Sequence, residues 1–144
     1  GDGDVAPPPP PRPAAMERKG SWRENYEKKS ADGLTTVEMQ EIIDVTKECY
    51  GLASTLVRYG DERTAKQQLD SLLSAMAHLF EIAAPVSKHN AVKPHMKTFS
   101  QCVTPLSKMA AKPVLSKIRP HVERIRATVR ELNRILKHLK SQMA

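Results

Sequence analysis

The feature that most constrains this chain is a long heptad pattern in its last third, over residues 113–143. Apolar residues recur there at alternating spacings of three and four, which places them along one side of a single helix. They are Leu115, Ile118, Val122, Ile125, Val129, Leu132, Leu136 and Leu139. Because such a face must be covered, we expect the rest of the chain to supply apolar partners for it.

The other faces of this predicted helix are strongly basic. The candidate partner-binding residues on them are Arg119, Arg126, Arg130, Arg134, Lys137 and Lys140. Residues 1–85 hold 10 Lys and Arg against 14 Asp and Glu, whereas residues 86–144 hold 13 against 2. Three interpretations stay open: a well-solvated basic face, neutralisation by the acidic part of the chain, and binding of an anionic partner.

The first 33 residues form a proline-rich arm that lacks the apolar surface to join a core, and we expect this arm to be disordered. The folded domain is then predicted over residues 34–144. Residues 7–13 read PPPPPRP and favour an extended polyproline II conformation. Within them Pro7, Pro10 and Arg12 fit the pattern that SH3 domains bind. The alternative interpretation is a plain stiff linker.

Three further helices are predicted before the basic one. Thr35 and Glu38 are spaced as a capping box for a helix over 36–58, which ends before Gly60. Asp61 is expected to cap a second helix that ends near Ala84. The apolar face of this second helix is predicted to comprise Ala65, Leu69, Leu72, Leu73, Met76, Ala77, Phe80 and Ala83.

A third helix follows, with heptad positions from Val92 to Ala110. Pro94 suits its first turn, whereas Pro105 predicts a kink or break near residues 103–104 because it removes a backbone hydrogen bond. Pro120 predicts a kink in the last helix, or a separate short turn over 113–119. Four amphipathic helices with short connections predict an all-α protein, an antiparallel up-down-up-down four-helix bundle.

No motif for catalysis is present. The chain lacks the P-loop, GxGxxG, GxSxG and HExxH patterns, and its five histidines are scattered. Cys49 and Cys102 have no ligand spacing and are expected to be buried free thiols, which favours a reducing compartment, cytoplasmic or nuclear. We therefore expect no enzyme, no metal and no cofactor. No apolar run approaches the length of a membrane span.

Two binding hypotheses remain. The first is a protein-docking domain of a scaffold or adaptor, which binds an amphipathic partner helix in a groove between two helices. The second is a binder of an anionic partner, such as nucleic acid, acidic lipid or the actin surface, through the basic last helix. A strict heptad face can also pair with a second copy of the chain, so self-association stays open as well.

Two short segments resemble a known family. Val45-Thr46-Lys47, and Met76-Ala77-His78-Leu79-Phe80 followed by Pro85, are similar to the first two helices of the focal-adhesion-targeting (FAT) type of four-helix bundle in Git-family adaptors. The resemblance implies a cytoskeletal scaffold with a groove for short leucine- and aspartate-rich helices, and a vinculin-like actin contact is a related expectation. The last two predicted helices depart from the family, with internal prolines and a far more basic final helix.

Overall fold

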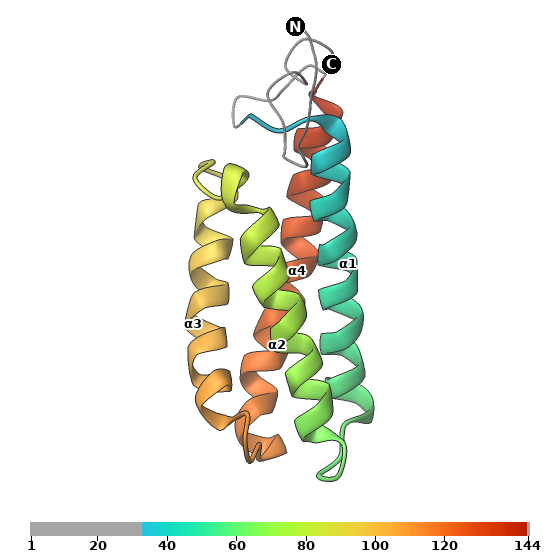
Figure 1. Cartoon of the computed structure of the whole chain (residues 1–144), viewed down its shortest axis with the longest axis vertical. Helices are drawn as coiled ribbons and strands as arrows, with labels where there is room; N and C mark the ends of the chain where they lie inside the picture. Colours follow the sequence, from blue (N-terminus) through green and yellow to red (C-terminus); the bar gives the residue numbers. More distant parts are fainter. Residues whose placement is uncertain (1–32, 144) are drawn as a thin grey trace, which may run out of the picture.

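The computed structural model describes residues 33–143 of the 144-residue chain. Within them the chain forms four α-helices and no strand (Figure 1). The elements in order are α1 (Thr36–Tyr59), α2 (Ala65–Ile82), the 3-10 helix η2 (Ala84–Val86), α3 (Lys93–Met109) and α4 (Leu115–Ser141). The prediction of an all-helical protein with four helices is confirmed.

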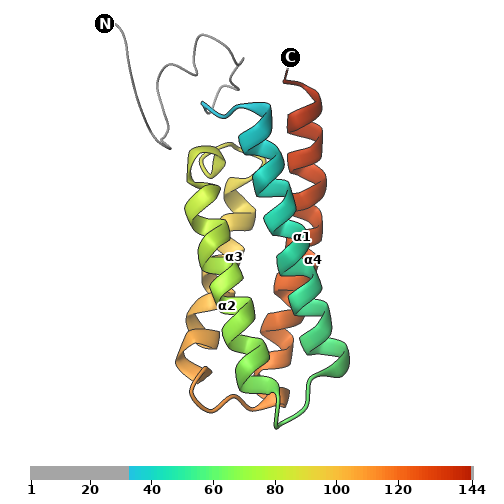
Figure 2. The same ribbon diagram turned by 45° about the vertical axis from the view of Figure 1, so that its right-hand side comes forward.

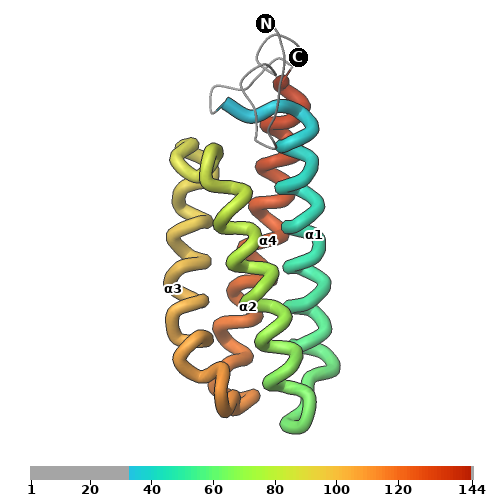
Figure 3. The backbone as a smooth tube through the Cα atoms, in the orientation of Figure 1, coloured from blue at the N-terminus to red at the C-terminus, as the bar shows by residue number. Residues whose placement is uncertain are grey.

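The helices lie side by side, each in contact with the helices before and after it in sequence. α4 also lies against α1, and this pair has the most extensive contact of all (Figure 2). The start of α1 and the end of α4 lie at one end of the molecule (Figure 3). The α1–α2 and α3–α4 connections lie together at the other end (Figures 1 and 2).

The beginning and end of α1 follow from local sequence. The Glu38 amide donates to the Thr35 hydroxyl at 3.1 Å, and the Glu38 carboxylate accepts from the Thr35 amide at 2.9 Å. The predicted capping box is therefore confirmed. Gly60 stands at the C-cap, where its amide donates to the Leu56 carbonyl at 3.2 Å.

The predicted limits of α2 are wrong by several residues at its start. The helix begins at Ala65, and Asp61 closes the preceding turn instead of capping the helix. Its carboxylate accepts from the amides of Thr64 at 2.9 Å and Arg63 at 3.0 Å and from the Thr64 hydroxyl at 3.0 Å. These hydrogen bonds lower the pKa of Asp61, and the bonds from Thr64 have the largest effect. Because the Asp61 side chain accepts the hydrogen bonds of this turn, the helix begins only after the turn, at Ala65.

Neither internal proline interrupts its helix. α3 runs from Lys93 to Met109 through Pro105, so of the predicted kink or break the break is wrong, while Pro94 lies in the first turn as expected. α4 passes through Pro120, which excludes a separate short turn over 113–119. Each proline removes only one backbone donor. The buried residues on either side of each proline, such as Leu106 and Ile118, hold the helix against its neighbours.

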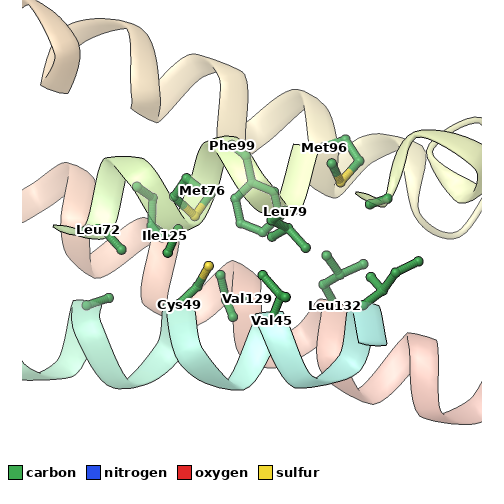
Figure 4. Close-up of a cluster of buried hydrophobic side chains, with 14 of the residues drawn as sticks. Val45, Cys49, Leu72, Met76, Leu79, Met96, Phe99, Ile125, Val129 and Leu132 are labelled. Atoms are coloured by element: carbon green, nitrogen blue, oxygen red, sulfur yellow. The ribbon is translucent and has the colours of Figure 1, made fainter. Parts of the chain in front are cut away.

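The apolar face of α4 lies in the core between the helices, as the heptad pattern predicts. Its six central members are fully buried, and the terminal Leu115 and Leu139 are half-buried. The buried six are Ile118, Val122, Ile125, Val129, Leu132 and Leu136. Figure 4 shows Ile125, Val129 and Leu132 surrounded by side chains from the other three helices. The covering partners that this helix requires come from within the chain.

The predicted apolar face of α2 is confirmed for five of its eight residues and differs at the others. The five that are buried are Ala65, Leu69, Leu72, Met76 and Ala83. Ala75 and Leu79 are buried, whereas Ala77 is exposed and Leu73 and Phe80 are only partly covered. The helix packs against both α1 and α3, and this double contact turns Leu79 inward (Figure 4). Periodicity therefore located most of the buried side, and the contact with both neighbours adds Ala75 and Leu79 to it.

Both cysteines are buried free thiols, as expected. Burial, and to a lesser degree the charge of Glu48, raises the pKa of Cys49 to about 12. Burial also raises the pKa of Cys102. The two side chains therefore act in the core as small neutral groups at neutral pH.

Alanine substitution is expected to have opposite effects at Gly51, within α1, and at Gly60, the C-cap of α1. Gly51 is exposed in mid-helix and a Cβ there meets nothing within 4 Å, so Gly51→Ala should stabilise by about 0.5–1 kcal/mol. A Cβ on Gly60 would lie 2.4 Å from the Leu56 carbonyl oxygen, so Gly60→Ala must move the backbone and should destabilise. Urea unfolding of both variants measures the difference. A gain in stability for Gly60→Ala would contradict this account.

Candidate binding groove between α1 and α4

A depression in the surface runs between α1 and α4, and we call it the α1–α4 groove. Three residues of α1 line it, Thr46, Lys47 and Tyr50. From α4 it is lined by Glu123, Arg126, Ala127, Val129, Arg130, Glu131, Asn133, Arg134 and Lys137. The two walls come from residues that lie far apart in the sequence, which the α1–α4 contact brings together.

A polar contact joins the two helices at the floor of this groove. The Asn133 side-chain amide donates to the Thr46 hydroxyl at 2.8 Å and approaches the Ile43 carbonyl at 3.5 Å. The buried Thr46 hydroxyl in turn donates to the Ile43 carbonyl at 2.5 Å. Such a bond is satisfied only in one register of the two helices, so it aligns the groove walls. Asn133, beside the apolar heptad residues of α4, was missed by the sequence analysis.

Tyr50 supplies an aromatic ring in the middle of the groove. The Arg126 guanidinium lies over this ring, 5.6 Å from its centroid, in a cation–π contact. Hydrogen bonding and charge from Arg126, with a smaller effect of Arg130, lower the pKa of Tyr50. The direction of this shift is that expected for a phenol in a positive potential.

Four of the six predicted basic residues line the groove together. These are Arg126, Arg130, Arg134 and Lys137, and Lys47 of α1, which the prediction omitted, joins them. The other two lie outside it: Arg119 is exposed on α4, and Lys140 donates to the Gln40 side chain of α1 at 2.5 Å.

The groove cations differ in their partners. Arg134 forms an ion pair with Glu131 on the same helix, and this contact lowers the pKa of Glu131. Within residues 33–143 no carboxylate lies within ion-pair distance of Lys47, Arg126, Arg130 or Lys137. Their charge is therefore available to a ligand from outside the described part of the chain.

In the described part of the chain no ion pair joins the acidic residues of α1 to the basic residues of α4. Glu41, Asp44 and Glu48 are exposed. The ion pairs in the described part of the chain are Lys66–Asp70 and Arg134–Glu131, and each stays within one helix. Of the three interpretations of the charge asymmetry, internal neutralisation has no ion pair between α1 and α4 to support it.

The remaining candidates give no site in the described structure. Pro7, Pro10 and Arg12 of the SH3-ligand candidate lie outside residues 33–143. Among the residues described, no group of three or more His, Cys, Asp or Glu side chains is placed to hold a metal ion. None of the helices in this range is long and apolar enough to cross a membrane.

Comparison of the chain with models of protein families, with curated proteins and with solved structures finds no match in any of the three. The resemblance to the FAT-type bundle thus stays a prediction from two short segments. The geometry of the α1–α4 groove is accordingly the basis for assigning a function.

Proposed function

We propose that this protein is a non-enzymatic docking domain of a scaffold or adaptor, which binds an acidic amphipathic helix of a partner protein in the α1–α4 groove. One observation carries the proposal. Cations without a carboxylate partner among residues 33–143 stand on both walls of the groove, Lys47 on α1 and Arg130 and Lys137 on α4, around the ring of Tyr50.

The fold supports such a role. We take the four helices as an antiparallel up-down-up-down bundle, in keeping with the short connections and with the neighbours of each helix. The apolar heptad face of α4 is buried inside this bundle, which leaves its basic side for external contacts. The bond from Asn133 to Thr46 holds the two walls of the groove in register before any ligand arrives, and such preorganisation lowers the entropy cost of binding.

The dimensions of the groove suggest the length of its ligand. Its lining on α4 extends from Glu123 to Lys137, which at 1.5 Å per residue corresponds to about 20 Å. A partner helix of about four turns matches this length. Its apolar anchors would contact the Tyr50 ring and Ala127, and its flanking carboxylates would face Lys47 and Arg130. The leucine- and aspartate-rich helices implied by the resemblance have this chemistry.

A second candidate is a binder of anionic polymers or surfaces through α4 alone. The exposed Arg119, which lies outside the α1–α4 groove, favours it. Such a binder would recognise charge without requiring a helix with an apolar face, and its affinity would fall steeply with salt.

Two further properties belong to the proposed role of an adaptor. Pro7, Pro10 and Arg12 would bind an SH3 domain, and the protein would be located in the cytoplasm.

The test uses the full chain and a labelled peptide of about four helical turns. Leucines at i, i+3, i+4 and i+7 give the peptide one apolar face, and Asp and Glu flank that face. A second peptide has the same composition in an order that destroys the apolar face. Fluorescence anisotropy should show saturable binding of the first peptide and much weaker binding of the second. Equal binding of both peptides would favour the charge-only candidate and contradict docking.

Two pairs of substitutions with the same charge change locate the site. Lys47→Glu with Arg130→Glu reverses one cation on each wall of the groove. It should weaken peptide binding at least about 30-fold, on the order of 2 kcal/mol. Lys93→Glu with Lys97→Glu reverses two exposed cations on α3 and should change affinity by less than about threefold. An equal loss in both double variants would show that binding depends on net charge and not on this groove.

A further inference from the structure

A second basic surface surrounds the α3–α4 connection, at one end of the bundle. The sequence from Ile82 to Val122 contains no Asp or Glu. Four cations of this stretch lie near the connection, and all four are exposed: Lys108, Lys112, Lys117 and Arg119. In the described part of the chain none of them has a carboxylate within ion-pair distance. None of the four lines the α1–α4 groove.

An exposed valine lies among these cations. Val114 is 43% exposed and occupies the N-cap of α4, with φ −112° and ψ 116° and no side-chain cap bond. Helix N-caps favour Ser, Thr, Asp and Asn, whose oxygens accept a free backbone amide. A valine there cannot cap the helix, and its side chain is only partly covered by the rest of the protein. Its exposed methyl groups, which Lys112 and Lys117 flank in the sequence, are open to a partner.

A second exposed side chain with a large apolar part, that of Tyr59, lies at the same end of the molecule. Three large apolar side chains are exposed within residues 33–143, namely Val37, Tyr59 and Val114. Tyr59, 73% exposed, ends α1, and Figures 1 and 2 show the α1–α2 connection beside the α3–α4 connection. Two acids, Asp61 and Glu62, are also present here, and Asp61 is engaged in its turn. We call this surface, with Tyr59, Lys108, Lys112, Val114, Lys117 and Arg119, the lysine end.

We propose that the lysine end binds the surface of an anionic lipid membrane. Its lysines and arginine would meet anionic headgroups, since each cation near such a surface strengthens binding about fivefold. Val114 and Tyr59 would enter the interface between headgroups and acyl chains, where apolar side chains and tyrosine are favoured. Nucleic acid is the less favoured ligand because phosphate contacts leave the exposed valine without a role.

The position of the lysine end gives the bound protein an orientation. The start of α1, which follows the proline-rich arm in the sequence, lies at the opposite end (Figure 3). The α1–α4 groove runs along the side, with its lining from Glu123 onwards on α4. A molecule that stands on the membrane by its lysine end would therefore leave the groove open to a partner helix. This inference is independent of the proposed docking function.

Co-sedimentation with vesicles tests the proposal on the full chain. Vesicles of phosphatidylcholine are compared with vesicles that also contain about 30% phosphatidylserine, at about 0.15 M salt, where charges are screened beyond about 8 Å. The protein is expected to bind only the vesicles that contain phosphatidylserine. The double variant Lys112→Glu, Lys117→Glu should bind these vesicles at least about 25-fold more weakly. Arg130→Glu with Lys137→Glu makes the same charge change in the α1–α4 groove and should weaken binding less than about threefold.

Insertion of the apolar residue is tested separately. In a Trp22→Phe background, the Val114→Trp variant should shift its fluorescence emission to the blue on phosphatidylserine vesicles, and Val114→Ser should bind them more weakly than the unsubstituted chain. Circular dichroism verifies that every variant is folded. The proposal is overturned by an absence of binding, by equal binding to both kinds of vesicle, or by an equal loss in the two double variants. It is also overturned if the emission of the Val114→Trp variant does not change on phosphatidylserine vesicles and the unsubstituted chain binds an RNA oligomer as well as it binds these vesicles.

Discussion

Phe99→Ala is expected to lower the free energy of unfolding by about 3–5 kcal/mol, a large share of the stability of a domain of this size. Phe99 is fully buried in α3, and its ring meets that of Phe80 edge to face, with centroids 6.4 Å apart. It is the largest side chain in the fully buried core, and Figure 4 shows it beside Leu79 of α2. Truncation would leave a cavity between two helices that share few other contacts.

Urea unfolding followed by circular dichroism measures this loss. Phe99→Leu is the matched control, because it keeps most of the apolar volume and should cost clearly less than the alanine variant. A loss below about 1 kcal/mol for Phe99→Ala would mean that the core collapses around the site, and would contradict the close packing around Phe99.

Pro105→Ala is expected to raise the free energy of unfolding by about 2 kcal/mol. A proline inside a helix costs about 3 kcal/mol because it lacks the amide that would donate to the carbonyl four residues earlier, here that of Gln101. Since α3 is continuous through Pro105, alanine can restore this bond. Loss of the rigid ring makes the unfolded chain more flexible, which offsets the gain by up to about 1 kcal/mol.

Pro94→Ala provides the control within the same helix. Pro94 lies in the first turn of α3, where an amide has no acceptor within the helix, so the substitution should change stability by less than about 1 kcal/mol. Thermal and urea unfolding of the two variants give the comparison. Destabilisation by Pro105→Ala would show instead that the packing of α3 depends on a bend at this proline.

The features of this protein that local sequence determines are those whose cause lies within one helix. The spacing of residues 115–139 requires a single buried face, and the structure buries its centre completely. The capping box of Thr35 and Glu38 joins residues three apart, so it forms wherever that helix lies. The two buried thiols were likewise predictable from apolar positions on amphipathic helices.

Only the tertiary structure decided which basic residues act together. From the sequence, Arg119 to Lys140 form one basic row, but the contact with α1 divides it. Arg130 and Lys137 face Lys47 across a groove, Arg134 pairs with its neighbour Glu131, and Lys140 bonds to Gln40. The continuity of α3 through Pro105 and the burial of Ala75 and Leu79 on α2 are also tertiary outcomes. Periodicity describes one helix at a time, whereas a groove depends on the register between helices, which contacts such as Asn133 to Thr46 establish only when the chain is folded.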